Sequence, residues 1–252
     1  MYQLRVIQFL ILYVFITFGS SCVSQETESS ASALNSTRQD SLYEYRSGDP
    51  NGIGKWYMGR EIAHVMGYQG INWLERDERE QEEDTKKLMA NMDIQSTDVI
   101  ADIGAGSGYH VFKIAPIAKQ GLVYAVDIQP EMLEAIESKN QALGLDNIRL
   151  IKGEGQSTKL PTDSIDKLLM VDVYHEFSYP KEMLESIYKA LRSDGKIYLI
   201  EYRKEDPKVP IKEIHKMTEE QAVKEFEASG FELIENIDNL PWQHCMVFGK
   251  KD

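Results

Sequence analysis

The sequence predicts an α/β fold: a seven-stranded, mostly parallel sheet with helices on both faces and an antiparallel last strand. Three observations lead to this fold class. From residue 98 onward, short apolar runs alternate with helical segments, which is typical of a parallel sheet covered on both faces. A glycine-rich turn follows the first apolar run directly. The last two runs, residues 231–238 and 244–250, are separated by only five residues, too few for a helical crossover.

The elements follow one another in chain order. Before the two last strands, we expect strands at residues 99–103, 123–128, 148–153, 167–173 and 195–202. Between and after these strands, we expect helices at residues 109–118, 130–142, 181–191 and 218–229. Pro130 supports the second helix, because proline is favoured in the first turn of a helix.

An N-terminal helical lid is expected to precede the sheet, over residues 49–97. Residues 56–66 carry apolar side chains at helical spacing. Residues 75–87 form a run of charges in which acidic residues stand four positions before basic ones, as Glu75 does before Arg79. This order supports a helix. We interpret the charge run as the solvated face of a helix and assign it no chemistry.

A short apolar run at the N-terminus predicts export. Residues 6–18 are almost entirely apolar, Arg5 is the only charge before them, and small residues lead to Cys22. A membrane-spanning helix needs about 20 residues, so this run is too short to cross a bilayer. Its layout is that of a secretory signal peptide, and it resembles a bacterial lipoprotein signal in which Cys22 is lipidated. The alternatives are an uncleaved anchor or a buried apolar helix.

The chain is therefore predicted to divide into four parts. These are a signal peptide at 1–21, a flexible tether at 22–48, the lid at 49–97 and the α/β domain at 98–252. The tether is rich in Ser and Thr and too poor in apolar residues to fold alone. The expected location is the cell envelope, with the domain facing the periplasm on a lipidated Cys22. If the signal interpretation is wrong, the expected location is the cytoplasm.

Composition excludes several other classes of protein. The 252 residues carry 28 basic and 41 acidic side chains, for a formal net charge of -13. Nucleic-acid binders usually present a basic face, so no nucleic-acid partner is expected. The two cysteines do not form a disulfide framework, no Cys/His spacing resembles a zinc site, and no metal ligands are predicted. We expect Cys245, within the last strand, to be a small buried hydrophobic residue.

The glycine-rich turn predicts a ligand at the carboxyl ends of the strands. Gly104, Gly106 and Gly108 follow the first strand, and glycine lets the backbone approach a ligand closely. Asp102 precedes the turn, and Asp127 closes the second strand 23 residues after Gly104, where a carboxylate can accept hydrogen bonds from ribose hydroxyls. Dinucleotide-binding enzymes space their third glycine one position later.

These residues, together with the antiparallel seventh strand, resemble the class I S-adenosylmethionine-dependent methyltransferases over residues 98–250. Residues 57–66 and 73–76 resemble the N-terminal part of a bacterial methyltransferase subgroup. The resemblance implies a Rossmann-like fold and S-adenosylmethionine as cofactor. It further implies that the glycines line the methionine and ribose, that Asp102 orients the amino group, that Asp127 binds the ribose and that Glu154 faces the adenine. The remaining predicted cofactor contacts are Ala105, Ile128, Gly155 and Asp172.

The catalytic candidates follow the fourth strand, in residues 172–177. Methyl transfer needs alignment, desolvation and a base for the acceptor's proton. His175 is the candidate base, because the imidazole pKa lies near neutrality, and Tyr174 is a second candidate. A structural role for His175, capping a helix or packing under the lid, is the alternative. Secondary candidates for acceptor contacts, each with a structural alternative, are Tyr57, Arg60, His64, Tyr202, Arg203, His215 and Lys216.

The predicted function is methyl transfer from S-adenosylmethionine to a small-molecule or lipid-like acceptor at oxygen, carbon or nitrogen. The segment at residues 172–177 lacks the Asn-Pro-Pro-Tyr sequence of enzymes that methylate exocyclic or amide nitrogens, which argues against a DNA-adenine or glutamine acceptor. One alternative is a catalytically silent binding module on the cell envelope. Another is an NAD-dependent oxidoreductase, which the glycine spacing disfavours. The oligomeric state stays open.

Overall fold

The computed structural model describes residues 42–251. The predicted signal peptide, Cys22 and most of the predicted tether lie outside the described residues. Within residues 42–251, no helix has the length and apolar character that a membrane span requires.

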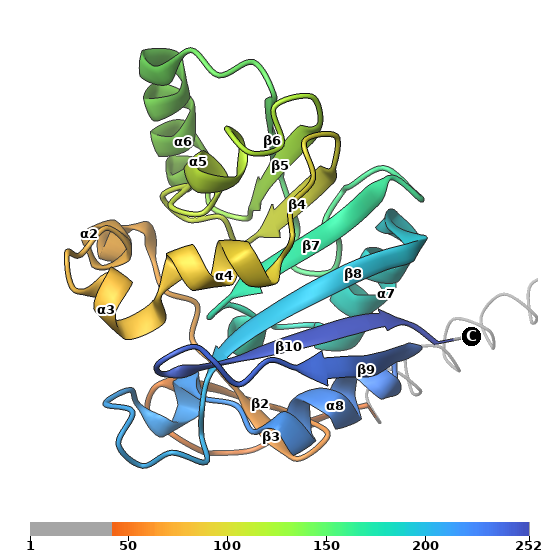
Figure 1. Cartoon of the computed structure of the whole chain (residues 1–252). Coiled ribbons are helices and arrows are strands. Elements are labelled where there is room, and N and C mark those ends of the chain that lie inside the picture. Colours follow the sequence, from red (N-terminus) through yellow and green to blue (C-terminus); the bar gives the residue numbers. More distant parts are fainter. Residues whose placement is uncertain (1–41, 252) are drawn as a thin grey trace, which may run out of the picture. The chain divides into compact units, whose positions relative to one another are not determined.

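A seven-stranded sheet forms the centre of the fold (Figure 1). Its strand order is β6-β5-β4-β7-β8-β10-β9. The first five of these strands run parallel, whereas β10 is antiparallel to both β8 and β9. The predicted fold class is thus confirmed. The strands are β4 (Val99–Ile103), β5 (Leu122–Asp127), β6 (Ile148–Lys152), β7 (Ile165–Val171), β8 (Leu191–Tyr202), β9 (Phe231–Asn236) and β10 (Gln243–Lys250).

Helices cover both faces of the sheet, because both sets of alternating strand side chains are apolar. One face packs Ile100 and Leu169 against α4 (Thr85–Asn91), α5 (Val111–Ile114) and α6 (Pro130–Leu143). The opposite face packs the neighbouring side chains of the same strands against α7 (Pro180–Ala190) and α8 (Glu219–Glu227). Cys245 is free and fully buried within the first of these cores, as predicted.

One helix is shorter than predicted. The helix expected at residues 109–118 is limited to α5, Val111–Ile114. Pro116 stands two residues after its end, and proline disfavours continuation of a helix because it lacks an N–H and restricts the residue before it.

The N-terminal part of the lid is a small sheet, so the helix predicted at residues 56–66 is wrong. Strands β1 (Tyr43–Tyr45), β2 (Gly52–Tyr57) and β3 (Arg60–Ala63) form an antiparallel sheet in the order β1-β2-β3. Met58 and Gly59, both with positive φ, form a two-residue loop between β2 and β3. Two positive φ values are typical of the tight hairpin turn, and this turn forces the chain back on itself where a helix was expected.

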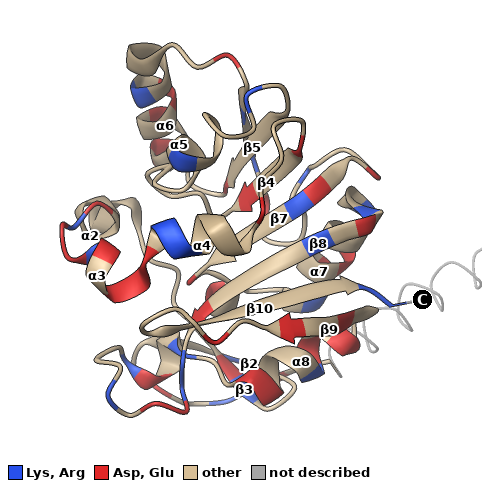
Figure 2. Ribbon diagram, viewed as in Figure 1, with Lys and Arg blue, Asp and Glu red and all other residues tan. Residues whose placement is uncertain are grey.

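The rest of the lid consists of short helices: η1 (Tyr68–Gly70), α2 (Ile71–Leu74), α3 (Arg79–Glu83) and α4. The charge run forms two helices, because Asp84 (φ 50°) ends α3 and its side chain caps α4 by accepting from Lys87 N at 3.1 Å. Figure 2 shows acidic residues on α3 and along α8 and β9.

Candidate active site

A cavity of about 610 Å³ lies at the carboxyl ends of the parallel strands. Gly104 after β4, Asp127 at the end of β5, Asp172 after β7 and Tyr202 at the end of β8 line its base. Residues 65–83, called the lid segment below, contribute Val65, Met66, Trp73, Leu74, Arg76, Arg79 and Glu83 to its wall. The cavity thus lies where ligands bind in open α/β sheets.

The glycine turn brings backbone to the cavity surface. Gly104 (φ 72°) and Gly106 (φ 54°) both line the cavity in conformations that other residues rarely adopt. A Cβ on Gly104 would lie 2.4 Å from Val173 Cγ2, and one on Gly106 would lie 2.6 Å from Leu74 Cδ1. Leu74 of the lid segment therefore packs directly over the turn.

The other two predicted residues of this turn face the protein interior. A Cβ on Gly108 would lie 2.7 Å from Phe112 Cε2, so this glycine permits close packing of α5. Ala105 is buried in the core beneath the turn. Neither residue lines the cavity, whose lining includes Gly104 and Gly106.

Asp127 lies at the base of the cavity, and each of its two carboxylate oxygens accepts a hydrogen bond from a backbone N–H group. Gly106 N donates to Oδ2 at 2.9 Å, and Gln129 N donates to Oδ1 at 2.9 Å. Burial raises the pKa of Asp127, while these backbone hydrogen bonds act in the opposite direction. Each oxygen keeps a further lone pair for a ligand hydroxyl. Ile128, next in the chain, also lines the cavity.

Asp102 lies behind the glycine turn. The side chain is only 2% exposed, and its Oδ2 is buried without a hydrogen-bond partner among the described residues. Burial raises the pKa of Asp102 to about 7, with Arg79 lowering it and Asp127 raising it further. An unpartnered buried carboxylate oxygen is costly and is typical of a site that awaits a donor.

Glu154 and Gly155 lie on the cavity wall beyond β6, where the resemblance places the adenine. Glu154 also forms an ion pair with Lys159 at 3.0 Å, and both side chains are about half exposed. Asp172 lies at the base, where its Oδ2 accepts from Gln243 Nε2 at 2.6 Å. The pKa of Asp172 lies well above its usual range because of burial and, next, the charges of Glu83 and Glu201.

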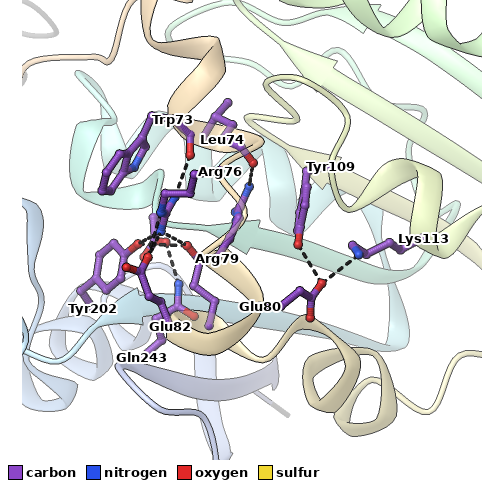
Figure 3. Close-up of polar contacts among 12 residues, drawn as sticks. Trp73, Leu74, Arg76, Arg79, Glu80, Glu82, Tyr109, Lys113, Tyr202 and Gln243 are labelled. Atoms are coloured by element: carbon purple, nitrogen blue, oxygen red, sulfur yellow. Dashed lines mark hydrogen bonds and ion pairs between the residues drawn. The ribbon is translucent and has the colours of Figure 1, made fainter.

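Buried ion pairs hold the lid segment together, and a hydrogen bond from Tyr202 joins it to the sheet (Figure 3). Arg79 pairs with Glu83 at 2.7 Å, and Arg76 pairs with the same carboxylate at 2.8 Å. The Tyr202 hydroxyl on β8 donates to Glu83 Oε1 at 3.1 Å. Arg79 also donates to the Leu74 carbonyl at 2.8 Å, which holds Leu74 over Gly106. The interpretation of the charge run as a solvated face is therefore wrong for Arg79 and Glu83, which lie within the site.

His175 lies in a cluster of titratable side chains on the cavity wall. Its Nδ1 is 2.7 Å from Glu201 Oε2, and its Nε2 is 3.1 Å from His215 Nδ1. Glu176 Oε1 lies 3.9 Å from each of these two facing nitrogens. His175 and Glu176 belong to η2 (Tyr174–Glu176), and His215 to η3 (Glu213–His215).

The cluster shifts the pKa of each of its members. Burial lowers the pKa of His175, but the charge and hydrogen bond of Glu201 outweigh it, so the pKa lies above its usual value. Burial and, next, the charge of His175 lower the pKa of His215 to about 4. Burial raises the pKa of Glu176 to about 7, although His175 acts against it. Opposed shifts among neighbouring titratable groups are typical of functional sites.

Tyr174 points away from the cavity. Its hydroxyl is buried and donates to Glu225 Oε2 at 2.8 Å, in the core beneath α8. Glu225 also pairs with Arg60, which donates to the His175 carbonyl at 3.0 Å. Tyr174 and Arg60 thus support the backbone of His175. The prediction of Tyr174 as a catalytic residue is wrong, because its hydroxyl does not reach the cavity.

Most secondary candidates also lie elsewhere. His64 is exposed, Tyr57 belongs to a small core beside β1, Arg203 pairs with Asp238 and Lys216 pairs with Glu213. Tyr202 and His215 do line the cavity. Glu176 lies in the candidate segment 172–177 without a predicted role, and the sequence does not predict a role for Glu201; the available signal is a carboxylate near the end of the mostly apolar strand expected at 195–202.

The strand order, the antiparallel β10, the glycine turn after β4 and the carboxylate at the end of β5 together define a class I methyltransferase. The family comparison agrees with this class: a model described as a methyltransferase domain matches residues 94–246. The chain therefore belongs to this methyltransferase-domain family.

The individual relatives share low sequence identity with this chain. An uncharacterized methyltransferase, YcgJ of Bacillus subtilis (strain 168), is 25% identical over 164 residues, which cover 64% of either chain. A protein-L-isoaspartate O-methyltransferase of Ignicoccus hospitalis is 27% identical over 104 residues, covering 41% of this chain and 46% of that protein. The chain therefore spans less than two thirds of the length of these curated relatives. The crystal structure of a SAM-dependent methyltransferase from Aquifex aeolicus has a TM-score of 0.69 and 22% identity, covering 73% of this chain and 98% of that one.

S-adenosylmethionine fits the residues present. Gly104 and Gly106 bring backbone without side chains to the cavity surface, and Asp127 offers free lone pairs to hydroxyls. Asp102 lies behind the glycine turn and does not line the cavity, so its unpartnered Oδ2 can act on a cationic amino group only through water or through the turn. The family match thus favours the methyltransferase over the NAD-dependent alternative.

Proposed function

We propose that the protein methylates a small molecule held between the glycine turn and the His175 cluster. The observation that carries the proposal is the His175–Glu201 pair, buried on the wall of the cavity that also contains Gly104 and Asp127. A hydrogen-bonded imidazole–carboxylate pair is a common means of placing a base for an acceptor's proton.

The size and enclosure of the cavity support a small acceptor. A volume of about 610 Å³ is within the range of small-molecule sites and must also contain the cofactor. Met66 N donates to Glu176 Oε1 at 3.2 Å, and Gln129 bonds to Met66 O and Tyr68 N at 3.0 and 2.8 Å, which closes the lid segment over the cavity.

The chain's own residues are proposed to bind the cofactor, orient the acceptor and take the acceptor's proton. Asp102, Asp127 and Glu154 are the residues proposed to hold the cofactor, with Asp172 at the base. The cofactor supplies an activated sulfonium methyl group when bound. His175 donates its Nδ1–H to Glu201, so that Nε2 is the nitrogen that can take the acceptor's proton. The lid segment excludes water, which strengthens these interactions.

The test follows a labelled methyl group. The purified full chain is incubated with methyl-labelled S-adenosylmethionine and a cell extract separated into small-molecule, lipid and macromolecular fractions. We expect label in the small-molecule fraction, lost with Asp127→Ala and reduced with His175→Gln. Label only in the macromolecular fraction would contradict the proposal, and label in the lipid fraction would replace the small molecule by a lipid-like acceptor. Cofactor binding without transfer to any fraction would instead support the silent binding module.

We also propose that the enzyme is anchored at the cell envelope through a lipidated Cys22. Support comes from the sequence alone: Arg5, the apolar run at 6–18 and the small residues before Cys22. Metabolic labelling with a radioactive fatty acid tests this proposal. We expect incorporation into the full chain and none into Cys22→Ala; equal labelling of both, or of neither, would contradict it.

A further inference from the structure

Three potential metal ligands converge on the cavity wall. His175 Nε2 and His215 Nδ1 lie 3.1 Å apart, and Glu176 Oε1 lies 3.9 Å from each. Within the described part of the chain, these side chains form a His–Glu–His group whose ligand atoms all lie within 4.8 Å of one another. All three residues line the cavity.

These separations are close to those of a loaded site. Zinc binds imidazole nitrogen and carboxylate oxygen at about 2.0–2.2 Å, so neighbouring ligands of a tetrahedral ion lie about 3.3–3.5 Å apart. The two nitrogens are within a few tenths of an ångström of that separation. Glu176 would need to move by about half an ångström, which its side-chain torsions allow.

A second carboxylate orients the first imidazole. Glu201 is fully buried on β8 and accepts hydrogen bonds from the backbone N–H groups of Tyr174 and His175 at 2.9 and 3.3 Å. Its other oxygen lies 2.7 Å from His175 Nδ1. This contact directs the Nε2 lone pair toward His215 and Glu176. Metal-ligating histidines commonly have such a carboxylate behind them, because it fixes the ring orientation and the tautomer.

The charges around the cluster favour a cation. Glu176 and Glu201 face it with two carboxylates. Of the neighbouring cations, Arg60 is neutralised by a two-fold contact with Glu225 at 2.8 and 2.9 Å. Lys212 bonds to Asn51 at 2.8 Å on the exposed side of η3. A divalent ion would therefore meet a local excess of negative charge.

We propose that His175, Glu176 and His215 bind one divalent transition-metal ion, with its open coordination position facing the cavity. Three protein ligands with an open position are the arrangement of catalytic zinc sites. An ion here would take the Nε2 lone pair of His175. A coordinated acceptor hydroxyl would then lose its proton because the cation lowers the pKa of that hydroxyl. Metal binding is measurable without acceptor or cofactor, so the inference stands or fails apart from the proposed function.

Equilibrium dialysis of the full chain tests the site. The protein is first stripped with a chelator and then titrated separately with Zn²⁺, Mn²⁺ and Co²⁺, and bound metal is counted by elemental analysis. We expect one ion of at least one of these metals per chain. With Co²⁺, visible absorption bands report whether nitrogen and oxygen ligands hold the ion.

Variants assign the ion to this cluster. His215→Ala and Glu176→Gln should each weaken binding at least ten-fold, and Glu201→Gln, which only touches the first imidazole, by about ten- to hundred-fold. His244→Gln is the matched control, because His244 also pairs with a carboxylate, Glu205 at 2.9 Å, but does not line the cavity. It should bind as the unmutated chain does. Circular dichroism confirms that each variant is folded.

Each outcome of the metal-binding experiment supports or overturns the proposed site. Absence of binding with all three metals, or binding that His215→Ala and Glu176→Gln leave unchanged, would overturn the proposal. Binding that His244→Gln abolishes while His215→Ala retains it would place the ion elsewhere and also overturn it. Stoichiometric binding lost selectively in the cluster variants would establish the site, even if no methyl acceptor were found.

Discussion

The buried carboxylate of Asp102 lowers the stability of the cofactor-free protein when it is ionised. Burial raises the pKa of Asp102 to about 7, from a usual value of about 4. The folded state therefore retains a proton that the unfolded state has lost between these two values. Stability consequently falls as the pH rises through this window. Above it, the folded chain must hold a buried charge whose Oδ2 has no partner among the described residues.

We therefore expect Asp102→Asn to stabilise the cofactor-free protein at pH 8 while weakening its affinity for S-adenosylmethionine. The gain in unfolding free energy should be about 1–4 kcal/mol at pH 8 and should shrink toward pH 4. Urea denaturation at both pH values, with calorimetric titration of the cofactor, measures the two effects. In the control Asp127→Asn, one backbone donor loses its oxygen acceptor, so affinity should fall without this gain. An equal change in stability at both pH values would contradict the prediction.

At the scale of elements, the hairpin between β2 and β3 depends on its two-residue turn. Gly59 has φ 95°, and a Cβ there would meet no atom within 4 Å. Because a side chain at this position would be unfavourable only through its positive φ, Gly59→Ala should lower the unfolding free energy by about 1 kcal/mol. Gly67→Ala is the control, because Gly67 has φ -68°, and it should change stability by less than about 0.5 kcal/mol. Thermal or urea unfolding compares the two, and equal effects would show that the turn does not require glycine.

The same element shows why apolar spacing misassigned residues 56–66. Apolar side chains in and beside a hairpin can also fall at helical spacing over a short segment, as Met58, Ile62 and Val65 do here. The deciding property is the backbone conformation of Met58 and Gly59, which periodicity does not encode. The MG pair lacks the Asn or Asp that usually indicates such a turn.

Helix α3 of the lid segment contains a buried ion pair between its first and last residues. The side chains of Arg79 and Glu83 are 5% and 4% exposed, so neither charge has solvent available. Arg79→Met should destabilise the protein by about 2–4 kcal/mol, because it leaves Glu83 with one fewer counter-charge in the interior. Arg192→Met is the matched control: its partner is Asp166, but the Arg192 side chain is 44% exposed, so the loss should stay below about 1 kcal/mol. Similar losses of unfolding free energy in both variants, measured by urea denaturation, would contradict the prediction that burial makes the Arg79–Glu83 pair more important for stability.

At the scale of the whole molecule, the sequence predicted the sheet and the cofactor side of the cavity but not the opposite wall. Gly104, Gly106 and Asp127 directly follow apolar strands, so strand order alone brings them together. His175, by contrast, contacts Glu201 and His215, which lie 26 and 40 residues further along the chain, on β8 and η3. Such convergence depends on how η2 and η3 pack above β8, which has no periodic signature. The charge run was misinterpreted for the same reason, since burial of Arg79 depends on its tertiary partners.

The lid segment should respond to the cofactor as a unit. It lines the cavity from Val65 to Glu83, and Leu74 packs against the glycine turn that the cofactor must approach. Its attachment is polar: Glu176 and Gln129 bond to Met66 and Tyr68, and Tyr202 donates to Glu83, which also pairs with Arg76 and Arg79. Polar anchors over a cavity open more readily than a packed core, so amide hydrogen exchange in residues 65–83 should be faster than in β4 or β7.

We expect S-adenosylhomocysteine, the demethylated product, to slow exchange of the lid segment at least ten-fold. The physical reason is that a ligand filling the cavity contacts both the sheet and the lid, so opening the lid costs the ligand its contacts. Hydrogen exchange followed by mass spectrometry measures the change, with α8 as an internal control because Glu219–Glu227 does not line the cavity. Equal protection of α8 and the lid would indicate global stabilisation only. Protection of residues 104–129 without any change at 65–83 would show that the lid segment does not cover the bound cofactor.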